Sequence, residues 1–167
     1  MATTHTERDP SGMGRIPEFS APASTGQTLA RHSFAGKVPL VITFVSDFDT
    51  DASARLAGFN DRLADFGARR VQVLAVAKEP ARIVREFAAG LGLKFPILAD
   101  AGGELARAMG VAGDGGVPAD RTFIADVSGA IVARFDHIDP GAHAATVLDA
   151  LDDLTGDLGD RMDPAVR

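Results

Sequence analysis

Side chains that could do chemistry gather at two points of the sequence. One is a loop between an apolar run and a helical pattern, where the candidates are Ser46, Asp47, Phe48, Asp49, Thr50 and Ser53. The other is Arg121, which opens a later apolar run. A serine becomes a nucleophile only when a base lies within hydrogen-bond reach. Ser53 can therefore be a nucleophile, a ligand contact or an ordinary first-turn residue of a helix.

The three carboxylates of the first point, Asp47, Asp49 and Asp51, also allow two interpretations. They can form a helix N-terminus, with Thr50 or Asp51 as the cap and negative charge favoured by the helix dipole. They can instead serve a pocket that exchanges protons or binds a cation. A calcium loop of the EF-hand type is disfavoured, because its glycine and final carboxylate positions hold other residues.

Arg121 is the candidate cation for such a pocket. A guanidinium suits a carboxylate, phosphate or peroxide-like ligand, because its planar donors can bind two oxygens at once. The alternative is a structural salt bridge to Asp47 or Asp49. A third motif, Asp136 followed by His137, is either an acid–base couple or a solvated strand end.

Composition excludes several classes of protein. The 167 residues are 46% hydrophobic and 24% charged, as expected for one soluble domain. The net charge of −6 argues against nucleic acid as a partner. No run approaches the roughly 18 apolar residues of a membrane span. We expect no metal and no cofactor.

The sequence predicts three regions. Residues 1–14 lack the apolar core of a signal peptide and are expected to be a disordered leader, which makes the cytoplasm the expected location. Residues 15–155 form the domain, and 156–167 form a polar tail. Cysteine is absent from the whole chain, so no disulfide or thiolate is available.

The apolar pattern predicts an α/β fold with alternating strands and helices. Strands are predicted at 38–45, 71–77, 95–98, 121–125 and 130–135, after a short edge element at 26–29. Helices are predicted at 51–67, 80–91, 103–109 and 141–154. The alternation demands parallel strand pairs with right-handed crossovers, and a turn at 126–129 adds one antiparallel pair. The result is a central mixed sheet flanked by helices.

Four stretches resemble the peroxiredoxin (AhpC/TSA) family: 16–22, 38–59, 95–100 and 121–131. The family signature Pro-x-x-x-Thr-x-x-Cys places Ser46 at the proline, Thr50 at the threonine and Ser53 at the peroxidatic cysteine. The resemblance implies a thioredoxin-like fold of peroxiredoxin type. It also implies that Thr50 and Arg121 orient a ligand at the head of the helix, and that the domain forms a homodimer.

Replacement of the cysteine removes the family's chemistry. Peroxide reduction needs a thiolate that stores the oxidation as a sulfenic acid. A serine hydroxyl is scarcely ionised and has no reversible counterpart of that product. Three hypotheses remain: a repurposed enzyme acting on a small anionic or carbonyl-containing molecule, for instance in specialised metabolism; a non-catalytic protein that binds a ligand or partner; and a Cys-to-Ser trapped form of a one-cysteine peroxidase.

Overall fold

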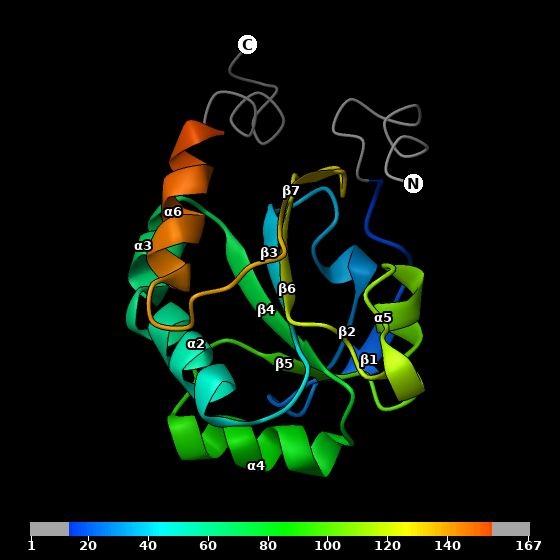
Figure 1. Cartoon of the computed structure of the whole chain (residues 1–167). Coiled ribbons are helices and arrows are strands. Elements are labelled where there is room, and N and C mark those ends of the chain that lie inside the picture. Colours follow the sequence, from blue (N-terminus) through cyan, green and yellow to red (C-terminus); the bar gives the residue numbers. More distant parts are fainter. Residues whose placement is uncertain (1–13, 155–167) are drawn as a thin grey trace.

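Strand β3 (Leu40–Val45) lies at the centre of the sheet, and all six of its residues are buried. The computed structural model describes residues 14–154. The strand order of the main sheet is β5-β4-β3-β6-β7, and Figure 1 labels these strands. An unbroken run of apolar and β-branched residues forms β3 because both of its faces are covered.

The pairing of the strands is mixed. Strands β4 (Gln72–Ala77) and β5 (Ile97–Ala99) run parallel to β3. Strands β6 (Arg121–Ala125) and β7 (Ile131–Phe135) form the predicted hairpin. The expectation of a single antiparallel pair in this sheet was wrong, because β6 also pairs antiparallel with β3.

The short helix α5 (Glu104–Ala108) explains this second antiparallel pair. Five helical residues rise only about 8 Å, which is too little to carry the chain back along the length of a strand. The 3₁₀ turn η2 (Asp114–Gly116), also short, follows it. Strand β6 accordingly begins at the end of the sheet where β3 and β5 finish, with Arg121 opposite Phe44, and runs in the opposite direction.

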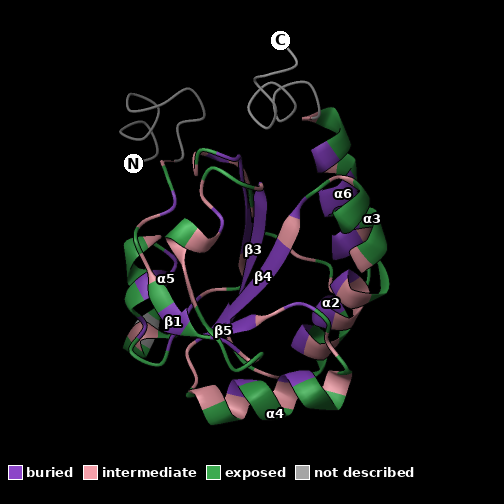
Figure 2. Cartoon of the chain, turned by 180° about the vertical axis from the view of Figure 1, so that it is seen from behind, coloured by how far each residue is buried: buried purple, intermediate pink, exposed green. Residues whose placement is uncertain are grey.

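Helices and a small hairpin cover the two faces of the sheet (Figures 1 and 2). One face packs against a set of four helices: α2 (Thr50–Asp61), α3 (Leu63–Ala68), α4 (Ala81–Leu91) and α6 (His143–Asp153). The other face packs against α5 and the N-terminal elements: β1 (Ser20–Pro22), β2 (Thr28–Ala30) and the 3₁₀ turn η1 (Arg31–Ser33). Each face has its own apolar core.

Several predicted boundaries differ from the structure. The helix predicted at 51–67 is two helices, α2 and α3, which meet at Arg62, where the backbone leaves helical geometry. The edge element predicted at 26–29 belongs to a two-stranded sheet, β1–β2, whose first strand was not predicted. The expected leader, apart from Gly14, and the expected tail lie outside the described residues.

Candidate functional site

The loop between β3 and α2 is held by its own helix and by a neighbouring one. The Asp49 carboxylate accepts a 2.8 Å hydrogen bond from the Ala52 backbone N–H and so caps α2. The expectation that Thr50 or Asp51 would be the cap was therefore wrong. Phe48 stacks on Phe87 of α4, with ring centroids 3.9 Å apart and planes 4° apart. Asp49 and Phe48 thus have structural partners that account for their positions.

Asp120, the residue before β6, ties this loop to the sheet. Its carboxylate accepts hydrogen bonds from the backbone N–H (2.8 Å) and the hydroxyl (3.0 Å) of Ser46. It also accepts one from Arg55 Nη2 at 2.7 Å. Partial burial would by itself raise the pKa of Asp120, but the hydrogen bonds from Ser46 and Arg55 and the guanidinium charge together lower it below its usual range.

Arg55 is a buried cation beneath the loop, with a side chain that is 3% exposed. Besides Asp120, it donates through Nη1 to the Thr43 hydroxyl (2.9 Å) and to the Phe44 carbonyl (3.0 Å). A buried charge is tolerated only when it is paired and hydrogen-bonded. Arg55 meets this condition through three partners.

A line of hydrogen bonds continues from Arg55 through the sheet to α6. Thr43 and Thr122 are opposite each other on β3 and β6, and their hydroxyl oxygens are 2.7 Å apart. The Thr122 hydroxyl lies 2.8 Å from His143 Nε2. The His143 ring is edge-on to Phe59 and Phe135. Burial, together with the nearby charge of Arg55, lowers the pKa of His143 to about 4, so the ring is neutral near pH 7.

Arg121 forms an ion pair, but not with the predicted partners. Its Nε lies 2.8 Å from Asp136 Oδ1. The same oxygen lies 3.1 Å from Arg134 Nε. The Nε–H of Arg121 is not aligned for a hydrogen bond in this contact. Two cations therefore share one carboxylate at the end of β7. The salt-bridge interpretation holds with Asp136 in place of Asp47 or Asp49.

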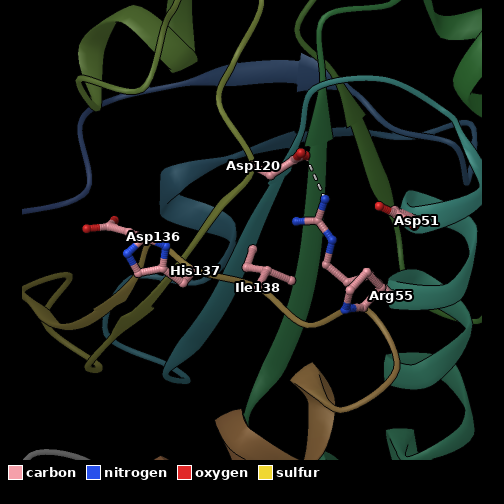
Figure 3. A pocket seen from close by; sticks show the side chains of 7 residues that line it. Asp51, Arg55, Asp120, Asp136, His137 and Ile138 are labelled. Carbon is pink, nitrogen blue, oxygen red and sulfur yellow. Dashed lines mark hydrogen bonds and ion pairs between the residues drawn. The ribbon is translucent and has the colours of Figure 1, made fainter.

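A pocket of about 340 Å³ opens beside Arg55. Its lining comes from α2, from the residue before β6 and from the segment after β7: Asp51, Arg55, Asp120, Asp136, His137, Ile138 and Pro140. Figure 3 shows Arg55 and Asp120 joined by their hydrogen bond among these side chains. Asp136 and His137, adjacent in sequence, thus belong to the same pocket.

The predicted catalytic residues Ser53, Thr50 and Arg121 do not line this pocket. Thr50, the first residue of α2, and Asp47 are exposed. Ser53 is partly exposed and donates its backbone N–H to the Asp49 carbonyl. Within residues 14–154, no hydrogen bond of the Ser53 hydroxyl is found, so no described base is in contact with it. A functional role for these three residues stays a prediction.

The predicted site residues did not include Arg55, Asp120 or His143. A signal for Arg55 was present, because it falls on the buried stripe of α2 with Ala52, Leu56 and Phe59. A charged residue at such a buried position needs a partner of opposite charge. Its partner Asp120 adjoins Arg121, the residue that the sequence singled out. Nothing in the local sequence around His143 indicates its contact with Thr122.

The described part of the chain contains neither a candidate metal site nor a candidate membrane-spanning helix. No group of three or more His, Asp or Glu side chains there could hold a metal ion. Among the same residues, no helix has the length and apolar character that crossing a membrane requires.

Several solved structures are similar in fold to this chain. Peroxidoxin BcpB from Mycobacterium tuberculosis has a TM-score of 0.78 and 23% identity, over 85% of this chain and 97% of that one. The bacterioferritin comigratory protein of Xanthomonas campestris has a TM-score of 0.75 and 25% identity, over 81% and 90%. AhpC from Enterococcus faecalis has a TM-score of 0.74 and 19% identity, over 85% and 92%.

The family model agrees with these structures. No curated protein matches the sequence at a significant level. The model of the AhpC/TSA family matches residues 14–134, which include α2, the loop before it and the central sheet except the last residue of β7. This chain, which has no cysteine, therefore belongs to the AhpC/TSA family.

Proposed function

We propose that this chain binds a small polar molecule in the pocket beside Arg55 and does so without thiol chemistry. The observation that carries the proposal is the position of this pocket. It lies at the end of the sheet where β3 leads into α2, the segment that holds the family signature. A buried cation and several convergent polar side chains line this concave pocket, and such convergence is typical of a ligand site.

Loss of the cysteine favours binding over the family's chemistry. The only sulfur in the chain is in its four methionines, and a thioether cannot replace a thiolate as the nucleophile. The loop that carries Ser46 is nevertheless held in place by Asp120, Asp49 and Phe48. A fixed loop beside a pocket is the preorganisation that a binding site requires.

A second candidate is a repurposed enzyme, and one observation favours it. His137 lies in the pocket together with Asp51 and Asp136. Histidine is the side chain that most readily exchanges a proton near neutral pH, and carboxylates can orient it. In this version the pocket would perform acid–base chemistry on a small molecule, with Ser53, Thr50, Arg121 and Asp49 as further candidates. The alternative of a Cys-to-Ser trapped peroxidase is weakened by Ser46, which replaces the signature proline as well.

A metabolite screen by thermal shift tests the proposal. A molecule that raises the melting temperature should lose this effect in His137→Ala and Asp51→Ala, because both residues line the pocket. It should keep the effect in Glu86→Ala, an exposed residue of α4 that serves as the control. Ligands that depend on Ser53 and Arg121 but not on His137 would instead locate the site at the predicted residues.

Mass spectrometry of the bound molecule separates the two candidates. A ligand that is recovered unchanged after long incubation identifies a binding protein. A product that forms with the wild type but not with His137→Ala identifies an enzyme. If no molecule in a broad screen depends on the pocket residues, the proposed function is wrong.

A further inference from the structure

Asp120 occupies the donors that a bound carboxylate would use. Its side chain accepts from one backbone N–H and one hydroxyl, both of Ser46, and from the guanidinium of Arg55, at 2.7–3.0 Å. Amide, hydroxyl and guanidinium donors at these distances form charge-assisted hydrogen bonds, which are the strong ones in proteins. The same set would hold the carboxylate of a ligand equally well.

The two partners of this ion pair differ in how firmly they are held. The Arg55 side chain is 3% exposed, whereas that of Asp120 is 48% exposed. Arg55 is also bonded to Thr43 and to the Phe44 carbonyl inside the core. Asp120 has Arg55 as its one buried partner among the described residues, and its other two hydrogen bonds come from Ser46 in the loop. Rotation of its short side chain can bring the carboxylate into solvent. The cation is therefore fixed, while the carboxylate is replaceable.

The charges around the pocket make Arg55 the group that determines whether an anion can bind there. The carboxylate of Asp136 is already shared by Arg121 and Arg134. Asp51 lies in the pocket without an ion-pair partner in the described part of the chain and repels anions. With Asp120 in place, the positive charge of Arg55 is neutralised. Without it, the pocket would contain one buried, uncompensated cation.

We infer that Ser46 and Arg55 form a carboxylate-binding site whose resident occupant is the side chain of Asp120. Asp120 thereby excludes small anions from this site unless its side chain rotates away into solvent. For its biological meaning the inference rests on the proposed function, because it sets the ligand selectivity of the same pocket. Its test needs no natural ligand, so the inference and the proposed function can fail separately.

Formate is the probe, because it is the smallest carboxylate and matches the group that Asp120→Ala removes. The melting temperature is measured against formate concentration, with sodium chloride holding the ionic strength constant. Asp120→Ala should melt well below the wild type, because Arg55 loses its counter-charge. Formate should then restore a saturable part of the loss, with a half-effect on the order of 10 mM. The wild type should show no saturable response.

Three variants control for other causes. Asp120→Asn fills the site with a side chain of the same shape and should not respond to formate. Asp51→Ala removes a carboxylate from the same pocket without freeing a cation, and should not respond either. Arg55→Met combined with Asp120→Ala removes the fixed cation, so the rescue should vanish.

The other possible results of these titrations either support or overturn the inference. If Asp120→Ala is unfolded in buffer, folding induced by formate but not by chloride supports the site. Asp120→Ser provides a second, smaller replacement for the same titration. The inference is overturned if both of these variants lack a saturable formate response. It is equally overturned if the response persists without Arg55 or appears at the same concentration in the wild type.

Discussion

The Nε2 atom of His143, at the start of α6, lies 2.8 Å from the hydroxyl of Thr122 in the middle of the sheet. Thr122 in turn meets Thr43, which accepts from Arg55. This contact joins α6, which follows the pocket segment, to the ion pair that underlies the pocket. Protonation of the ring would place a second buried positive charge near Arg55.

This contact predicts a stability that depends on pH. The pKa of His143 is about 4 in the folded chain and about 6.5 in the unfolded chain. Between these values the unfolded state binds more protons, so the free energy of unfolding falls as the pH is lowered from 6.5 to 4. Above pH 6.5 the contribution is complete. The loss is at most about 3 kcal/mol for a shift of this size.

Urea denaturation across pH 4–7.5 checks this prediction, with His143→Gln as the variant that cannot titrate. The slope between pH 6.5 and 4 should be smaller in His143→Gln. The lowered pKa of Asp120 contributes in a different window, because its stabilisation is lost only as the pH falls below about 4. Equal slopes in the wild type and the variant would contradict the assignment to His143.

The buried ion pair predicts a large effect of Arg55→Met. This substitution keeps most of the apolar stem but removes the donors to Thr43, Phe44 and Asp120. We expect the free energy of unfolding to fall by about 3 kcal/mol, the lower end for breaking a buried pair, because Asp120 can return to water. Chemical denaturation measures the difference.

Arg82→Met is the matched control for that experiment. Arg82 pairs with Glu86 on the exposed surface of α4, with both side chains well solvated. Such pairs contribute at most about 1 kcal/mol, and often much less. If the two substitutions had similar effects, Arg55 would not have the structural weight that its burial indicates.

The chain is predicted to lack thiol peroxidase activity, because it has no cysteine. Stopped-flow consumption of hydrogen peroxide with a thiol reductant should equal that of buffer. Ser53→Cys is the informative comparison, since it puts sulfur at the signature position. Turnover by the wild type clearly above buffer would refute the argument that serine cannot replace the thiolate.

Self-association is the fourth prediction, and β7 is the strand concerned. It lies at one edge of the main sheet, and an edge strand offers unpaired backbone groups to another chain. We expect a homodimer, of about twice 17.4 kDa, in light scattering at micromolar concentration. A mass that stays at 17.4 kDa over a tenfold rise in concentration would contradict this expectation.

The sequence predicted the fold better than the site, for a physical reason. Apolar periodicity depends on neighbouring residues, so runs such as Val41–Val45 and the α4 stripe could be recognised directly. The direction of β6 depends on how the chain passes α5, which no local pattern encodes. The break at Arg62 likewise has no local signal, because neither a proline nor a glycine stands at that position.

The site depends on contacts between distant segments. The contacts of Asp120 with Ser46 and Arg55 form only because β3 and β6 are neighbours in the sheet. The sequence predicted strand β6 but not that it pairs with β3. The prediction chose Arg121 by resemblance, and the adjacent Asp120 is the residue that reaches the signature loop. A shift of one residue on a strand reverses the face of the sheet to which a side chain points.

The pocket walls come from α2, the residue before β6 and the segment after β7, which are distant parts of the chain. An unfolded chain cannot assemble these walls, so a ligand of the pocket would bind only the folded protein. By mass action, such a ligand would raise the free energy of unfolding of the whole domain by about 2.7 kcal/mol at a hundred times its dissociation constant. Proteases in cells degrade unfolded chains preferentially. The abundance of one small molecule could thereby set how long each copy of this protein survives.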